Sequence, residues 1–194
     1  MASTFNSIRE ETHEVVKESV KTDQKPGEMP ADPACLNVHV EKAMNDQINL
    51  ELSVAVFYRS LAHNFAQENI RLLGFVAFFE HSAQQQERHA AKLIKYLKTR
   101  GGRLQLKDLQ QPDEGNVAWH NSLESVKFYL VVEKRVNQAM LVLRELAEEC
   151  GDANLVAFLK SEYLNELMLD LEKISSLMQQ LEEQSADNSQ PKSF

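Results

Sequence analysis

The chain reads Gln84-Gln85-Gln86-Glu87-Arg88-His89-Ala90 in the middle of a long segment with helical apolar spacing. Residues three apart share one face of a helix, so Gln86 and His89 are expected to project together. Glu51 and Tyr58, which are seven residues apart, share a face of an earlier segment with the same kind of spacing. Two predicted helices therefore carry polar side chains within otherwise apolar stripes.

This arrangement is close to that of a metal site in a helical bundle. A glutamate from one helix that faces a Glu-x-x-His sequence on another is the usual way to build a di-iron carboxylate site. Glu51 and Glu133 supply glutamates on two other segments, but the first residue of the expected Glu-x-x-His is the amide Gln86. The pattern predicts metal-ligating positions at which one carboxylate has been replaced.

Composition limits the class of protein. The 194 residues suffice for one domain with a hydrophobic core, and the net charge of −8 argues against a nucleic-acid partner. Two cysteines do not make a disulfide framework, and no apolar run is long enough to span a membrane. The N-terminus lacks the apolar core of a signal peptide, and its glutamates are atypical of a transit peptide. We expect a cytoplasmic protein.

Apolar residues recur at three- and four-residue steps in four long segments, which predicts four helices. The first two are expected over residues 37–64 and 69–100 and the fourth over 153–183, while the third begins near a capping pair of Asn121 and Glu124. Gly101-Gly102 and Gly151 are expected to end the second and third helices, and Asp152 to cap the fourth. Residues 103–118 are long for a loop, so we expect a crossover that leaves the second and third helices parallel.

The chain divides into three parts on this interpretation. Residues 1–36 form an N-terminal extension, in which an amphipathic segment over residues 4–20 is expected to be helical and to dock, with a disordered acidic tail as the alternative. A Pro-rich linker follows it. Residues 37–184 form the all-α bundle, and residues 185–194 form a polar tail that is expected to be disordered.

Several motifs, in the same order, resemble eukaryotic ferritins of the heavy-chain type over residues 37–183. The motifs are Gln47-Ile48-Asn49-Leu50-Glu51-Leu52, Arg100-Gly101-Gly102-Arg103, Leu106-Lys107-Asp108-Leu109-Gln110-Gln111-Pro112, Glu133-Lys134-Arg135-Val136-Asn137-Gln138 and Tyr163-Leu164-Asn165-Glu166. The resemblance implies a ferritin-like four-helix bundle with a long crossover between helices two and three. It also implies an iron-storage subunit that handles Fe2+ and Fe3+ in a 24-subunit shell, as a homo-oligomer or with another ferritin chain.

The resemblance assigns the iron site residue by residue. It implies Glu51, His89 and Glu133 as metal ligands and places the catalytic-site tyrosine at Tyr58. The bridging glutamate of the family is here Gln86, and the glutamine expected on the fourth helix is here Leu167. Iron favours anionic oxygen and imidazole ligands, whereas an amide offers one neutral oxygen. We therefore expect that one metal binds at Glu51 and His89 and that a second is held poorly.

Other family positions also depart from the heavy-chain pattern. The face that lines the cavity, acidic in heavy chains, reads Gln85, Arg88 and Ala91. The positions of the threefold channel read Arg144, Val156, Ala157 and Lys160, where acids and histidine are expected. Because divalent cations are drawn to negative potential, a channel lined by cations would repel them.

Three readings of function follow. The first is an iron-storage subunit with a degraded ferroxidase centre. The second is a structural, light-chain-like subunit that co-assembles with a competent chain, and the third is a cage recruited to a task without iron. In structural terms alone, Glu51 and Glu133 are buried polar groups paired with Tyr58 or Asn137, His89 is a satisfied histidine, and Gln84-Gln85-Gln86 is a solvated or cavity-facing run.

Overall fold

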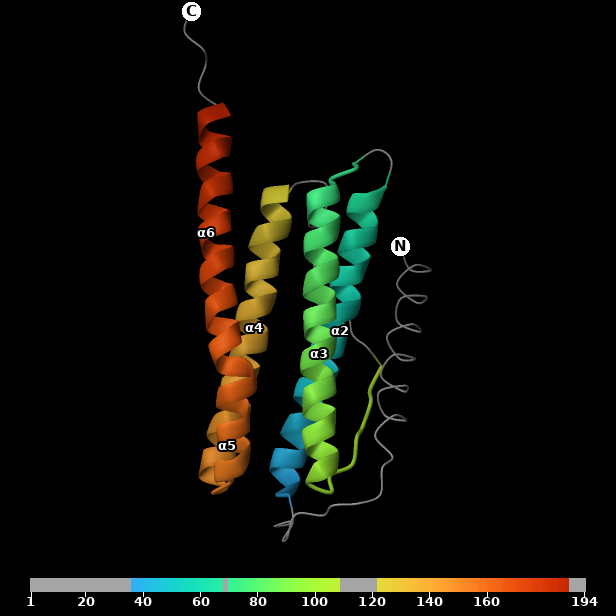
Figure 1. Cartoon of the computed structure of the whole chain (residues 1–194), viewed down its shortest axis with the longest axis vertical. Helices are drawn as coiled ribbons and strands as arrows, with labels where there is room; N and C mark the ends of the chain where they lie inside the picture. Colours follow the sequence, from blue (N-terminus) through green and yellow to red (C-terminus); the bar gives the residue numbers. More distant parts are fainter. Residues whose placement is uncertain (1–35, 68–69, 109–121, 189–194) are drawn as a thin grey trace, which may run out of the picture.

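The protein is an all-α bundle of four long rods, seen in a computed structural model that describes residues 36–67, 70–108 and 122–188 (Figure 1). The predicted segment over residues 4–20, the linker, Asn121 and the last six residues lie outside this described part. No strand occurs in the described ranges. The helices are α2 (Val38–Ala66), α3 (Leu73–Thr99), α4 (Ser122–Glu149), α5 (Ala153–Leu159), the π-helix η1 (Lys160–Leu164) and α6 (Asn165–Asn188).

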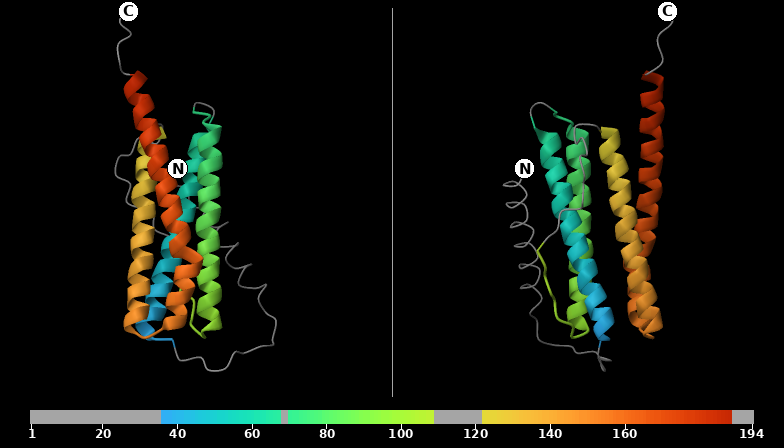
Figure 2. Two further views of the ribbon diagram at one scale, coloured as in Figure 1. Left: turned by 60° about the vertical axis from the view of Figure 1, so that its left-hand side comes forward. Right: turned by 180° about the vertical axis from the view of Figure 1, so that it is seen from behind.

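The direction of the rods confirms the predicted topology. In Figures 1 and 2, α2 and α6 run one way along the bundle, and α3 and α4 run the other way. Helices α3 and α4 both end at the end of the bundle where α5 begins, so α4 starts at the opposite end. The connection from α3 to α4 therefore has to span the length of the bundle. The long crossover between the second and third helices is therefore present. No described helix is long and apolar enough to cross a membrane.

The first half of the crossover is fixed to α2 by side-chain amides. Asn45 exchanges hydrogen bonds of 2.9 and 2.7 Å with the backbone of Arg103 and Gln105, and Asn49 exchanges bonds of 2.8 and 2.7 Å with Gln105 and Lys107. Four helical residues rise about 6 Å, close to the roughly 6.6 Å of two extended residues. Asparagines four residues apart can therefore bond the backbone groups of every second residue in an extended segment that lies beside the helix.

Glycines end α3 and α4 as the sequence predicts. Gly101 and Gly151 have φ angles of 74° and 72°, in the left-handed region that glycine adopts without strain. At the end of α3, the amides of Gly101 and Gly102 donate to the carbonyls of Lys98 and Leu97, which is a Schellman motif. The Asp152 carboxylate then caps α5 by accepting from the Leu155 amide at 3.0 Å.

The fourth rod differs from the continuous α-helix that we predicted over residues 153–183. Leu155, Leu159 and Tyr163 follow a four-residue step, and the next buried stripe restarts at Leu164 and continues through Leu167. The π turn of η1 adds the residue needed for Tyr163 and Leu164 both to face the interior. Helix α6 then continues to Asn188, because no glycine or proline interrupts residues 184–188.

The interior consists of two apolar clusters. One is mainly aliphatic and includes Met44, Leu93 and Leu143, and the other is rich in aromatic side chains such as Phe57, Phe79 and Tyr129. On α3, Gln86 and His89 lie between Ala83 of the aromatic cluster and Ala90 of the aliphatic cluster. The polar residues singled out in the sequence are therefore placed where the two parts of the core meet.

Candidate metal centre

The four predicted ligand positions are all buried inside the bundle. Glu51 on α2 is fully buried, Gln86 and His89 on α3 are 2% and 1% exposed, and Glu133 on α4 is 4% exposed. Buried polar groups of this kind need partners, because removing them from water is costly. Their hydrogen bonds show how this demand is met.

Glu133 is held by two neutral donors. The Tyr58 hydroxyl donates to its Oε1 at 2.7 Å, and the side-chain NH2 of Gln86 donates to the same oxygen at 2.9 Å. This is the pairing of Glu133 with Tyr58 that the purely structural reading expects. The NH2 group thus fills the place at which a bridging carboxylate would offer its second oxygen. A carboxylate at position 86 could not make this bond, because it has no proton to donate when ionised.

Glu51 is only half satisfied. Gln47, one helical turn earlier, donates to its Oε1 at 2.8 Å, while Oε2 has no hydrogen-bond partner in the described part of the chain. Within the same part, Gln47 Oε1, Gln86 Oε1 and His89 Nδ1 are also buried and without a partner. All four are atoms that can offer a lone pair. Buried acceptors without a donor are rare in an apolar core, and they are the kind of atom that a cation binds.

The geometry permits a single cation between Glu51 and His89. Glu51 Oε2 lies 3.9 Å from His89 Nδ1. Two ligands of one divalent transition metal, each at about 2.1 Å, are at most about 4.2 Å apart, so both atoms can reach one ion. Among the described residues, no three His, Cys, Asp or Glu side chains come together as a metal-binding group. Gln86, three residues before His89 on α3, offers a neutral amide oxygen in place of a carboxylate.

Burial shifts the acid–base behaviour of the centre. It raises the pKa of Glu51 to about 8, with the Gln47 hydrogen bond opposing the shift and the charge of Glu133 adding to it. Burial likewise raises the pKa of Glu133 to about 7, against the hydrogen bonds from Tyr58 and Gln86. Desolvation lowers the pKa of His89. Without a cation the centre therefore favours neutral forms, and a bound metal would displace protons from it.

Neither Glu87 nor Leu167 replaces the carboxylate that is missing at position 86. Glu87 points elsewhere and forms a two-pronged ion pair with Arg59, at 2.9 and 2.8 Å. Leu167 is 2% exposed and packs in the aliphatic cluster, so it offers no ligand. The solvated reading of the glutamine run is right for Gln84, which is exposed, and wrong for Gln86, because that side chain faces the core.

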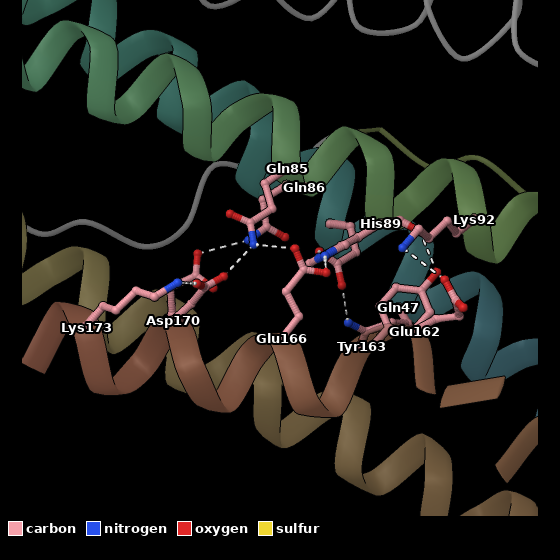
Figure 3. A network of polar contacts seen from close by, with 12 residues as sticks. Gln47, Gln85, Gln86, His89, Lys92, Glu162, Tyr163, Glu166, Asp170 and Lys173 are labelled. Atoms are coloured by element: carbon pink, nitrogen blue, oxygen red, sulfur yellow. Dashed lines mark hydrogen bonds and ion pairs between the residues drawn. The ribbon is translucent and has the colours of Figure 1, made fainter. Parts of the chain in front are cut away.

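A second polar layer faces the centre from the fourth rod. Figure 3 shows Gln85 of α3 pointing toward Glu166 and Asp170 of α6, and His89 pointing toward Glu166. His89 Nε2 lies 3.4 Å from Glu166 Oε2, and the Tyr163 hydroxyl donates to the His89 carbonyl at 2.8 Å. Sequence reasoning gave no role to Gln47, Tyr163, Glu166 or Asp170. The signal available for Gln47 was its four-residue spacing from Glu51.

Three of the four predicted channel positions line one surface groove. Arg144, Val156 and Lys160 border a groove of about 690 Å³ between α4 and the fourth rod, together with apolar Leu164 and Met168. Ala157 is exposed on α5. Arg144 Nε is 3.7 Å from Glu148 Oε1, which offsets part of its charge, while Lys160 is exposed. The two cations are therefore brought to the same surface.

A four-helix bundle with one long crossover, and with glutamate and histidine side chains buried between its helices, is the architecture of the ferritin-like carboxylate proteins. The ferritin-like domain family matches residues 41–183. The soma ferritin of Lymnaea stagnalis is 37% identical over 155 residues, covering 79% of this chain and 88% of that protein. The ferritin middle subunit of Salmo salar is 37% identical over 134 residues, covering 69% of this chain and 75% of that protein. The chain belongs to the ferritin family.

Proposed function

We propose that this chain is a subunit of an iron-storage shell whose internal centre binds one Fe(II) and oxidises it slowly. The observation that carries the proposal is the pair of buried, unpartnered atoms Glu51 Oε2 and His89 Nδ1, which lie 3.9 Å apart. Glu51 and His89 would be the metal ligands, and the Gln86 carbonyl oxygen a weaker third. An anionic oxygen combined with imidazole suits iron.

A second iron lacks ligands in this proposal. Oε1 of Glu133 already accepts from Tyr58 and Gln86, so Glu133 would bind that ion through Oε2 alone, and the Gln86 NH2 group supplies protons where a carboxylate would supply an oxygen. Leu167 supplies no donor. Glu133 would contact the centre, and Tyr58 would position it through the 2.7 Å hydrogen bond.

The missing second ion explains why oxidation would be slow. Reduction of dioxygen to peroxide takes two electrons, and a single Fe(II) supplies one. A paired site delivers both at once, whereas this site must wait for a second iron to arrive or release the electron singly. Iron is the substrate and cargo here, so its supply as well as its chemistry sets the rate.

Aerobic addition of Fe(II) to the purified protein, followed by absorbance of the ferric product, tests the proposal. We expect slow oxidation that is abolished in His89→Ala and faster oxidation by a heavy-chain ferritin measured beside it. A rate equal to the heavy chain would contradict the degraded centre. A rate unaffected by His89→Ala would place the oxidation elsewhere.

The light-chain-like function is the second candidate, and one observation favours it. Glu133 Oε1 accepts hydrogen bonds from both Tyr58 and Gln86 without a metal, as expected of a structural core. Under this alternative the chain would take up iron only when assembled with a competent ferritin chain. Mixed shells that oxidise iron in proportion to the competent chain, beside inert shells of this chain alone, would favour it over the one-iron centre.

Assembly is a further expected outcome. Large apolar side chains remain exposed on the single chain, among them Val131, Met168 and Leu169 at 62%, 60% and 57%. Burying such groups against other subunits stabilises an oligomer. We predict a large hollow particle by size-exclusion chromatography and negative-stain microscopy. A monodisperse monomer at micromolar concentration would contradict this.

Iron uptake should respond to the charge of Lys160. If the groove that contains Arg144 and Lys160 lines the threefold passage, the charge of Lys160 opposes the attraction of Fe(II) to Glu148 and Glu172 in the same groove. We predict that Lys160→Glu speeds uptake several-fold, most at low ionic strength, where the screening length is about 30 Å. Lys95→Glu, with the same charge change on α3, is the matched control. An equal effect of both variants, or none at any salt concentration, would mean that iron enters elsewhere.

A further inference from the structure

The fourth rod contacts His89 at three points. The Tyr163 hydroxyl donates to the His89 carbonyl at 2.8 Å, and the Tyr163 ring lies edge-on to the imidazole, with centroids 5.2 Å apart. Glu166 Oε2 lies 3.4 Å from the ring nitrogen Nε2, near the outer limit of a hydrogen bond. Tyr163 therefore holds the His89 backbone and one edge of the imidazole ring, and Glu166 contacts the ring nitrogen Nε2.

Glu166 is itself oriented by Gln85. The Gln85 side-chain NH2 has two protons, and it donates to Glu166 Oε1 at 3.2 Å and to Asp170 Oδ2 at 2.5 Å (Figure 3). Lys173 pairs with the other oxygen of Asp170 at 3.2 Å. With Oε1 occupied by the amide, Glu166 presents Oε2 to His89. A glutamate at position 85 would instead have added a third carboxylate beside Glu166 and Asp170.

The contact of Glu166 with Nε2 determines the state of the other imidazole nitrogen, Nδ1. If the proton sits on Nε2, where it can be donated to Glu166, then Nδ1 carries the lone pair. Nδ1 is buried, has no partner within the described part of the chain and lies 3.9 Å from Glu51 Oε2. The contact with Glu166 thus selects the tautomer and ring orientation in which the interior nitrogen can bind a cation.

We propose that Glu166, held by Gln85, is a positioning residue that fixes the His89 imidazole with Nδ1 directed toward Glu51. This inference rests on the proposed one-cation centre. Glu166 acts through His89 and is not itself a ligand of the central ion. Its side chain is 44% exposed, so its role does not depend on burying a charge. The chemistry resembles other sites in which a carboxylate orients a ligating histidine from the outside.

The test uses Co2+ as a spectroscopic substitute for Fe(II) with the full assembled chain. We expect Glu166→Leu to weaken Co2+ binding about 10- to 100-fold and to change the d–d absorption of the bound ion. Glu166→Gln keeps a carbonyl acceptor for Nε2–H and should recover most of the affinity. Gln85→Leu, which leaves the Glu166 charge in place, should weaken binding less than Glu166→Leu. Glu172→Leu removes the same charge from an exposed position of α6 and should bind as the wild type does.

The outcomes distinguish failure of the positioning role of Glu166 from failure of the one-cation centre. Glu166→Leu with wild-type affinity and spectrum would overturn the positioning role while leaving the one-cation centre intact. Glu166→Gln that loses as much as Glu166→Leu would also overturn it, because charge and not the hydrogen bond would then matter. Co2+ that binds wild type and His89→Ala equally would overturn the proposed function and the positioning role with it. Thermal unfolding of each variant establishes that the comparison is between folded proteins.

Discussion

Gln86→Glu should accelerate Fe(II) oxidation by about tenfold or more, taking the effect of altered metal ligation as a guide. The substitution replaces the NH2 donor of Gln86 by the second oxygen of a carboxylate, which could then bridge Glu51 and His89 on one side and Glu133 on the other. It also breaks the 2.9 Å bond to Glu133, which frees that carboxylate to bind a second iron. Two irons held together can then supply both electrons for peroxide. Stopped-flow absorbance after mixing with Fe(II) measures the rate.

Gln84→Glu is the matched control for this prediction. It makes the same charge change two residues away on the same helix, but position 84 is exposed. Its rate should stay close to that of the wild type. Equal acceleration by both variants would mean that a general attraction of Fe(II) to negative charge is responsible. Adding Leu167→Gln to Gln86→Glu should raise the rate further, because it restores an amide ligand at the fourth-helix position.

The metal-free protein should lose stability as the pH rises from about 5 to about 8. Burial raises the folded-state pKa values of Glu51 and Glu133 to about 8 and about 7, from 4.5 for an exposed glutamate. In that range the folded chain holds protons on these glutamates that the unfolded chain has released. The free energy of unfolding therefore falls as the pH rises. Each group contributes up to about 1.4 kcal/mol per pH unit between its two pKa values, several kcal/mol in all.

Thermal unfolding of the chelated protein across this pH range measures the effect. Glu51→Gln removes the group with the larger shift and should flatten the dependence, since an amide does not titrate. Added Co2+ should stabilise the wild type more at high pH, because the ion needs deprotonated ligands. An unchanged pH dependence in Glu51→Gln would show that the destabilisation arises at other groups.

Much of the fold follows from periodicity in the sequence. The apolar steps predict the helices to within a few residues at most ends, and the long unpatterned segment predicts the parallel direction of α3 and α4. Gly101 and Gly151 end helices because glycine adopts the left-handed conformation without strain. Local chemistry of this kind can be read before the structure is known.

Other features depend on partners that only the folded chain brings together. Asn45 and Asn49 look like ordinary polar positions of a helix until the crossover is laid beside them. The π turn at Lys160–Leu164 shows in the sequence only as a one-residue shift between two apolar stripes. At the centre, the sequence predicts that Gln86 weakens a bridge. It does not predict that the amide turns its NH2 toward Glu133 and leaves its oxygen unpartnered.

The number of metal ions at the centre is the most direct test of the central claim. Crystals of the wild type and of Gln86→Glu, soaked anaerobically in Fe(II), can be compared by anomalous difference maps at the iron absorption edge. We predict one peak in the wild type, between Glu51 and His89, and two peaks in Gln86→Glu, the second beside Glu133. Two peaks of comparable occupancy in the wild type would contradict the account.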